Sequence, residues 1–130
     1  MDRSSVQDWL DRYSDAWLSY DEAAIRSLFA PDARYRYHPY DPESDTVVGV
    51  DAIVENWLDN RDTAGTYDSH YEPYAVEGDR AVATGTSSYW TDASKATLSR
   101  VYDNVYLLGF DGDGRCTSFT EYFMKEPDAG

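Results

Sequence analysis

The stretch Ala33-Arg34-Tyr35-Arg36-Tyr37-His38-Pro39-Tyr40 reads as a tyrosine-rich strand set between helical segments. Its proline pushes His38 into an extended conformation and ends regular strand pairing. We therefore expect a strand over residues 33–38. We also expect it to carry the mouth of a pocket, with His38 at the rim or just inside.

Two helices are predicted before this strand. The spacing Ser4-x-x-Gln7 is typical of a capping box, and apolar residues then recur at helical intervals, which predicts a first helix over residues 5–19. Asp21 is a suitable cap for a second, short helix with Phe29 on its buried face. Pro31 is expected to stop that helix, because the residue before a proline is disfavoured in the helical conformation.

A third helix and four strands are predicted after it. Asp51 is the expected cap of the third helix. The strands cover residues 67–76, 81–90, 97–110 and 115–124, and Asp111-Gly112-Asp113-Gly114 is a strong hairpin signal before the last one. Helices followed by strands indicate an α+β fold, here three helices packed on one face of a curved antiparallel sheet. The length fits one domain over residues 1–130.

The composition excludes several classes of partner. A net charge of −14 argues against binding of nucleic acid or of anionic membrane surfaces. No apolar run is long enough for a membrane span, and the first residues lack the apolar core of a signal peptide, so we expect a cytoplasmic protein. Cys116 is the single cysteine, which excludes an internal disulfide and a thiolate zinc cluster. We expect no metal and no cofactor.

The order of elements resembles the NTF2-like superfamily, and within it the SnoaL-like group of cone-shaped α+β proteins. Three segments carry the resemblance, which covers nearly the whole chain: Ser27-Leu28-Phe29-Ala30-Pro31-Asp32-Ala33, Val48-Gly49-Val50-Asp51-Ala52-Ile53 and Phe110-Asp111-Gly112-Asp113-Gly114-Arg115-Cys116. It implies a cone with a pocket for a small hydrophobic molecule, and a homodimer. It does not choose a reaction, because this fold hosts isomerases, dehydratases, cyclases, epoxide hydrolases and non-enzymatic binders.

Ketosteroid isomerase-like members offer a more specific comparison. In those members a tyrosine of the first helix donates a hydrogen bond to the substrate oxygen, and Tyr13 occupies that place. They also carry an Asp-Pro at the end of the first strand as the proton-shuttling base, and this chain has His38-Pro39 instead. For their second donor, a protonated acid in a later strand, the nearest candidates here are Asp103 and Asn104.

His38 and Tyr13 each have a functional and a structural interpretation. A histidine titrates at about pH 6.5 and can transfer protons near neutrality, but at a strand end it can equally be a surface residue bonded to a carboxylate such as Asp41. The Tyr13 hydroxyl can donate to a substrate carbonyl, or it can belong to a core tyrosine whose hydroxyl reaches the rim.

Two later strands supply the candidate acids. Glu121 shares a face with Phe119, and a cavity there would raise its pKa, whereas an outward glutamate would lie at a dimer interface. Asp103 and Asn104 are adjacent and point to opposite faces, so only one can lie in the cavity. Asp103 alternates with Val101, Val105 and Leu107, and we expect this aliphatic row to pack under the helices.

Two functional hypotheses follow. The first is a cofactor-independent isomerase, cyclase or dehydratase acting on a hydrophobic, ring-bearing molecule. Its catalytic residues would be His38, Tyr13, Glu121 and Asp103, and its ligand-binding residues Trp17, Trp57, Tyr37, Asn104 and Phe119. The second is a non-catalytic module that binds a ligand or a protein. The abundance of tryptophan and tyrosine favours an aromatic-walled cavity in either case.

Overall fold

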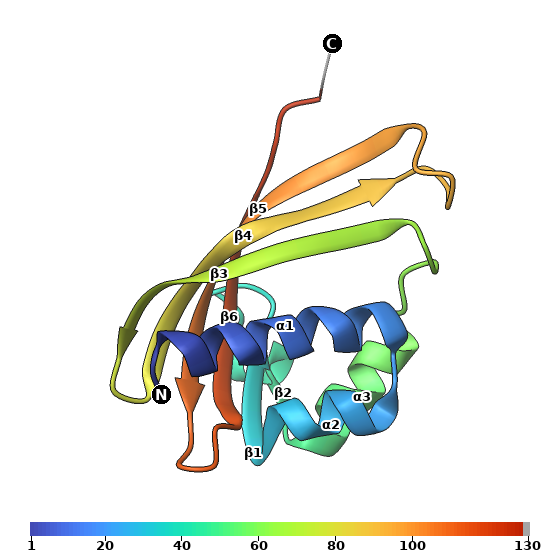
Figure 1. Ribbon diagram of the computed structural model, residues 1–130. Coiled ribbons are helices and arrows are strands. Elements are labelled where there is room, and N and C mark those ends of the chain that lie inside the picture. Colours follow the sequence, from blue (N-terminus) through green and yellow to red (C-terminus); the bar gives the residue numbers. More distant parts are fainter. Residues whose placement is uncertain (129–130) are drawn as a thin grey trace.

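The computed structural model describes residues 1–128, and in it three helices lie against one face of a curved, unclosed sheet (Figure 1). The helices are α1 (Arg3–Ser19), α2 (Glu22–Leu28) and α3 (Val50–Asp59). The strands are β1 (Phe29–Arg36), β2 (Val47–Val48), β3 (Tyr67–Glu77), β4 (Arg80–Trp90), β5 (Leu98–Phe110) and β6 (Cys116–Lys125), with a 3-10 turn η1 (Glu43–Asp45) before β2. This is the predicted α+β arrangement.

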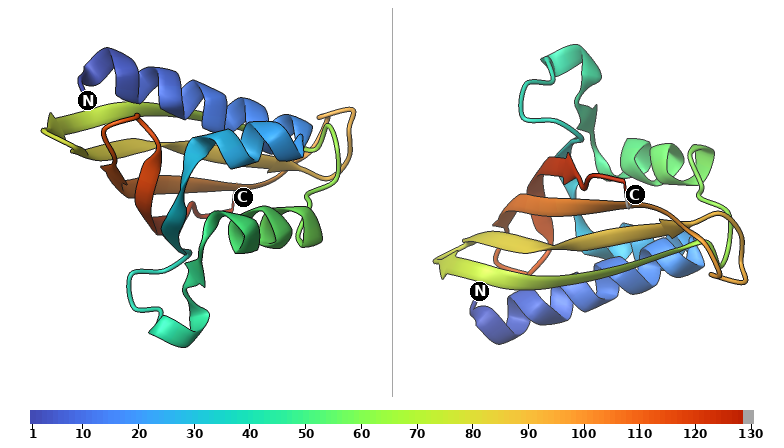
Figure 2. Two further views of the ribbon diagram at one scale, coloured as in Figure 1. Left: turned by 90° about the horizontal axis from the view of Figure 1, so that it is seen from below. Right: turned by 90° about the horizontal axis from the view of Figure 1, so that it is seen from above.

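The sheet has the order β2-β1-β6-β5-β4-β3. Strands β3 to β6 form the predicted antiparallel meander. The prediction of a wholly antiparallel sheet is wrong at one place, because β1 pairs in parallel with β6, with Tyr35 opposite Phe119. The first long strand and the last one therefore lie side by side, which Figure 2 shows from two further directions.

The start of α1 differs from the predicted capping box. Asp2 is the cap: its side chain accepts a hydrogen bond from the Ser5 amide at 2.8 Å, and Ser5 Oγ accepts one from the Asp2 amide at 2.9 Å. Because this reciprocal pair satisfies the free amides, the helix begins at Arg3 and the predicted Ser4 cap is not used. Gln7 donates instead to the Tyr71 carbonyl at 3.0 Å and ties α1 to β3.

The junction of α2 and β1 is sharper than predicted. Asp21 caps α2 as expected, with its side chain accepting from the Ala23 amide at 3.0 Å. Phe29 is not helical: its backbone is extended and it is the first residue of β1. Pro31 lies inside β1 and does not stop the helix. The strand tolerates the proline because pairing with β6 is irregular between Phe29 and Arg34.

Strand β1 ends at Arg36, so His38 lies in the following turn, in which the Asp41 amide donates to the His38 carbonyl at 3.1 Å. Helix α3 is preceded by Gly49, whose φ of 92° lies in the region that favours glycine. Asp51 is therefore not the cap that the sequence predicts. It lies in the first turn of α3 and forms an ion pair with Arg26 of α2.

The core lies between the helices and the concave face of the sheet. Trp9 is fully buried there, stacked on Tyr13 and in edge contact with Phe29 and Phe110. Cys116 is also fully buried, and burial raises the pKa of its thiol. Within residues 1–128, none of the helices is long and apolar enough to cross a membrane.

The predicted orientation of β5 is wrong. Tyr106 and Leu108 pack under the helices, whereas Leu107 is 41% exposed on the outer face and Asp103 is exposed as well. Both faces of β5 carry apolar residues, so alternation alone could not choose between them. The Tyr106 ring contacts Tyr71 and Phe119 in the core.

Candidate functional site

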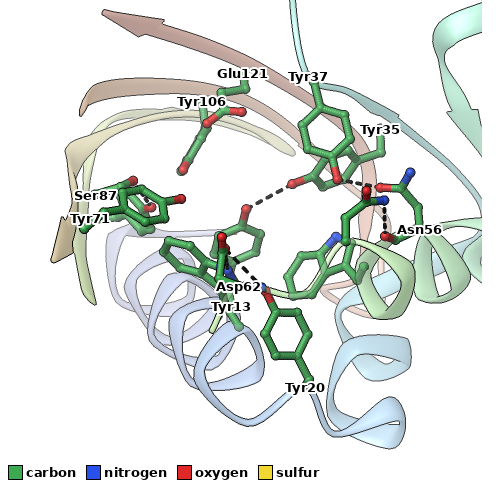
Figure 3. A pocket seen from close by; sticks show the side chains of 14 residues that line it. Tyr13, Tyr20, Tyr35, Tyr37, Asn56, Asp62, Tyr71, Ser87, Tyr106 and Glu121 are labelled. Atoms are coloured by element: carbon green, nitrogen blue, oxygen red, sulfur yellow. Dashed lines mark hydrogen bonds between the residues drawn. The ribbon is translucent and has the colours of Figure 1, made fainter. Parts of the chain in front are cut away.

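The main cavity has a volume of about 450 Å³ and lies between α1, α3 and the concave face of the sheet (Figure 3). Seven tyrosines and two tryptophans, Trp17 and Trp57, form most of its wall. The polar remainder of the lining consists of Asn56, Asn60, Asp62, Ser87 and Glu121. A cavity of this size and aromatic character suits a small ring-bearing molecule.

Two buried phenols form the floor of the cavity. The hydroxyls of Tyr13 in α1 and Tyr35 in β1 are 3.0 Å apart and hydrogen-bonded (Figure 3). Burial raises the pKa of both well above the usual tyrosine value, so both are neutral donors at physiological pH. Phe119 lies beneath them in the core, stacked on the Tyr35 ring at 4.3 Å between centroids.

A chain of hydrogen bonds runs from β3 through β4 and β5 to Glu121 in β6. Ser87 donates to Asn104 Oδ1 at 2.8 Å, and since this uses its one proton, Tyr71 is the donor in the 2.8 Å bond between the Tyr71 and Ser87 hydroxyls. Asn104 Nδ2 then donates to Glu121 Oε1 at 3.1 Å. Each member of the chain thus points its proton toward the carboxyl group.

Glu121 is the carboxyl group of the cavity wall whose pKa is shifted to near neutrality. Its burial raises the pKa of the carboxyl to about 7, while the neighbouring His38 and the hydrogen bond from Asn104 act in the opposite direction. A carboxyl group with a pKa near neutrality is populated in both protonation states at physiological pH. Glu121 can therefore accept a proton and return it.

His38 lies in a second, wider hollow of about 810 Å³, which Glu121 also borders. The two carboxylate oxygens of Asp41 lie 3.1 and 3.3 Å from His38 Nδ1, and the ring stacks on Tyr40. The structure thus shows the predicted Asp41 contact and also places the histidine near Glu121. Glu121 separates the two spaces, so it has aromatic surroundings on one side and His38 on the other.

The mouth of the main cavity is held by a loop that follows α3. Asp62 Oδ2 accepts a hydrogen bond from Trp17 Nε1 at 3.0 Å and a longer one, at 3.4 Å, from the Tyr20 hydroxyl. The Asp62 amide donates back to that hydroxyl at 2.9 Å. The sequence reasoning did not identify Asp62, because nothing distinguishes it from the other polar residues of residues 59–65.

The other candidates from the sequence are distributed as follows. Tyr13, Trp17, Tyr37, Trp57 and Glu121 line the main cavity. Asn104 and Asp103 border the second hollow, and Asn104 is hydrogen-bonded to Glu121. Phe119 is buried beneath the floor of the main cavity and does not line it. Asp103 is exposed beside Glu126, whose pKa its charge raises, which places it outside the aromatic cavity.

Five tyrosines of the wall were missed by the sequence reasoning: Tyr20, Tyr35, Tyr71, Tyr89 and Tyr106. Period-two alternation with Tyr37 could have found Tyr35, since Tyr37 was already a candidate. Tyr71 and Tyr89 carry no such signal. Within residues 1–128, no group of three or more His, Cys, Asp or Glu side chains could hold a metal ion. The chemistry visible in the cavity is that of two carboxyl groups, Asp62 and Glu121, and several phenols.

Comparison with known proteins supports the fold. The family model of the SnoaL-like domain matches residues 10–119. None of the curated proteins gives a significant match.

Three solved structures illustrate the similarity. A candidate polyketide cyclase from Sinorhizobium meliloti is 24% identical with a TM-score of 0.64, over 94% of this chain and 100% of that chain. A candidate ketosteroid isomerase from Kribbella flavida is 16% identical with a TM-score of 0.67, over 99% and 86%. An NTF2-like protein of unknown function from Burkholderia xenovorans is 16% identical with a TM-score of 0.68, over 98% and 88%.

At these identities the likeness of the three structures to this chain is one of fold. The family model, in contrast, spans most of the chain, from the middle of α1 into β6. The chain belongs to the family of SnoaL-like domains.

Proposed function

We propose that this protein is a cofactor-independent acid–base enzyme of the isomerase, cyclase or dehydratase type. Its substrate is a small, largely hydrophobic, ring-bearing molecule that binds in the main cavity. The observation that carries the proposal is the position of Glu121: its carboxyl group, with a pKa of about 7, borders a cavity whose wall is mostly aromatic. A buried carboxyl group tuned to neutrality in a cleft is a recurrent sign of a general acid or base.

The roles of the other groups follow from their positions. Tyr13 and Tyr35 offer neutral O–H donors on the cavity floor, which suits a developing negative charge on a substrate oxygen. Glu121 removes a proton from carbon and returns it to a neighbouring atom. His38, held by Asp41 in the second hollow, exchanges protons between Glu121 and solvent. This assignment keeps three of the four catalytic candidates and leaves out Asp103.

The protein is further proposed to act in the cytoplasm as a homodimer. The outer face of the sheet exposes Leu107, Tyr122 and Met124, at 41%, 42% and 75%. Neighbouring exposed apolar side chains on one face are typical of an interface. Light scattering tests the dimer: Leu107→Glu is expected to yield monomers, and a wild-type chain that is already monomeric contradicts it.

Proton transfer can be tested without knowing the full reaction. The protein is incubated in D₂O with a panel of cyclic ketones, and NMR follows deuterium uptake next to the carbonyl. The wild-type protein is expected to accelerate uptake for at least one ketone, Glu121→Gln to abolish this, and Glu55→Gln to leave it unchanged, since Glu55 is exposed on α3. Uptake that survives Glu121→Gln removes Glu121 from the mechanism. Ketones that bind without exchange favour the alternative, a non-catalytic binding module.

A further inference from the structure

The charged side chains that line the main cavity have one sign. Its lining includes the carboxylates Asp62 and Glu121, and within residues 1–128 it includes no lysine, arginine or histidine. Figure 3 shows these two carboxylates on different sides of the cavity. The whole chain carries a net charge of −14, which adds to the negative potential. A negatively charged ligand would enter such a cavity against repulsion and would find no cationic partner.

Each carboxylate keeps one oxygen available to a ligand. In Glu121 the hydrogen bond from Asn104 goes to Oε1, and in Asp62 both side-chain donors, Trp17 and Tyr20, bind Oδ2. Within residues 1–128, Oε2 of Glu121 and Oδ1 of Asp62 receive no such bond. These two oxygens can therefore accept hydrogen bonds from a ligand that carries N–H donors.

The aromatic wall also suits a positive charge. Tyr13 meets Trp57 at an interplanar angle of 89°, and Tyr71 meets Tyr106 at 65°, so these rings pack edge to face. Tyr13 itself is stacked between Trp9 and Phe119, so the other lining rings are the ones available to a cation. Tyrosine and tryptophan rings attract cations through the negative potential of their faces, and several rings together form the cages that bind quaternary ammonium groups. The cavity has nine such rings in its lining.

Two of these rings already bind cations of the chain itself. The guanidinium carbon of Arg100 lies 4.0 Å from the ring centroid of Tyr89, and that of Arg61 lies 5.9 Å from the ring centroid of Tyr20. Both tyrosines line the cavity, and neither arginine does. Contacts between an arginine and a tyrosine ring thus already occur on the outer side of the cavity wall. The interior of the cavity offers the same type of ring together with two carboxylates.

We infer that the cavity selects a positively charged organic ligand, so the substrate of this site is a ring-bearing amine or quaternary ammonium compound. This inference rests on the proposed function for the site and adds the substrate class. The rings hold the charged group by cation–aromatic contacts. Asp62 at the mouth and Glu121 on the wall neutralise it.

The test compares three probes of one shape and different charge: 4-hydroxyphenyltrimethylammonium, the neutral 4-tert-butylphenol and the anion 4-hydroxybenzenesulfonate. Binding is followed by NMR at the indole N–H of Trp17, which lies at the mouth. The cation is expected to bind at least about tenfold more tightly than the neutral probe, which corresponds to about 1.4 kcal/mol. The sulfonate is expected not to bind. Equal or tighter binding of 4-tert-butylphenol, or any binding of the sulfonate at similar strength, overturns the inference.

A charge-neutral substitution at the mouth provides the second arm. Asp62→Asn keeps a carbonyl acceptor for Trp17, and it is expected to weaken binding of the cation about fivefold while leaving 4-tert-butylphenol within about twofold. Asp59→Asn is the matched control: it removes the same charge nearby, from an exposed residue at the end of α3 that does not line the cavity. If both variants weaken the cation equally, only overall charge matters and the site is not selective. If Asp62→Asn disturbs the fold, Glu121→Gln replaces it in the same comparison.

The result separates this inference from the proposed function. Preference for the cation without any deuterium uptake, either by the cyclic ketones or by cyclic ketones that carry an ammonium group, identifies a binding module for organic cations. Deuterium uptake that depends on Glu121, together with preference for the neutral probe, leaves the enzyme in place and rejects the charged substrate.

Discussion

Asn104 donates a hydrogen bond from Nδ2 to Oε1 of Glu121 across the β5–β6 pair, at 3.1 Å. The amide is 4% exposed and is itself held by Ser87, so its orientation is fixed by buried partners. The carboxyl group therefore stays at the boundary between the two cavities. The pKa of Glu121 is raised by burial, and it is lowered by the charge of His38 and by this hydrogen bond from Asn104.

Glu121→Gln is expected to stabilise the protein at high pH. The pKa of Glu121 is raised from 4.5 to about 7 in the folded chain, so the wild-type protein loses stability as the pH rises from about 4.5 through 7. Glutamine has the same shape and does not ionise. Urea unfolding should show little difference between the two proteins at pH 4 and an advantage for the variant on the order of 2 kcal/mol at pH 8.

The control for this prediction is Glu55→Gln, because Glu55 is exposed. Its stability should follow that of the wild-type protein at each pH. A Glu121→Gln variant whose stability also runs parallel to the wild type from pH 4 to pH 8 would show that Glu121 has an ordinary pKa.

Asn104→Leu is expected to raise the pKa of Glu121 above about 7, because it removes the donor that favours the ionised form. It also leaves the buried Ser87 hydroxyl without its acceptor, so the free energy of unfolding should fall by about 1–3 kcal/mol. Carbon-13 NMR titration of the Glu121 carboxyl measures the first effect. Asn60→Leu, at the exposed cavity mouth, should leave the titration unchanged. An unchanged midpoint in Asn104→Leu contradicts the prediction.

The sequence predicted the elements of the fold well because their signals are local. Helical spacing located α1, and the Asp-Gly-Asp-Gly turn located the last hairpin. Pairing between distant segments has no local signal. The parallel contact of β1 with β6 emerges only when the chain is folded. The reciprocal cap between Asp2 and Ser5 is local, and it was missed because Ser4-x-x-Gln7 offered a competing capping spacing two residues further on.

The site was predicted less completely, and β5 shows why. Asp103 and Asn104 were recognised as alternatives on opposite faces, but Val105 and Tyr106 are both apolar, so the pattern could not tell which face is buried. Glu121 was recognised because it alternates with Phe119, which is fully in the core. Asp62 was missed because its partner Trp17 lies far away in the sequence.

His38→Gln is expected to raise the pKa of Glu121. The charge of a protonated His38 favours the ionised carboxyl group and so lowers the pKa of Glu121. When this charge is removed, only the hydrogen bond from Asn104 still opposes the rise in pKa that burial causes. The same carbon-13 titration measures the shift toward higher pH. His70→Gln is the matched control, because His70 is exposed on β3 and borders neither cavity. A titration of Glu121 that is identical in His38→Gln and the wild type would mean that the two side chains do not interact.

Gly85→Ala is expected to destabilise the protein and disturb the cavity wall. A Cβ atom there would lie 2.0 Å from the His70 carbonyl oxygen and 2.5 Å from Tyr71 Cδ1, so β3 and the Tyr71 ring must move. Overpacking of this kind costs about 1–3 kcal/mol or more. Gly112→Ala meets no atom within 4 Å and should change the free energy of unfolding by less than about 0.5 kcal/mol. Urea unfolding compares the two, and equal stability of both variants contradicts the close approach at Gly85.

Tyr13→Phe and Tyr35→Phe test whether the phenol pair acts as one unit. Their hydroxyls are 3.0 Å apart, so one proton joins the two oxygens and the other is left to donate to a substrate. Each single variant is expected to slow deuterium uptake by a reactive ketone about 10²–10³-fold, since loss of either hydroxyl disrupts the donor that meets the oxyanion.

The double variant Tyr13→Phe/Tyr35→Phe should then be scarcely slower than either single one, because the first substitution already disables the pair. Uptake rates of the four proteins form the cycle, and urea unfolding confirms that each remains folded. Tyr74→Phe serves as control, because Tyr74 is 74% exposed and should exchange at the wild-type rate. If the loss in the double variant equals the product of the two single losses, the hydroxyls contribute independently and the shared proton has no role in catalysis.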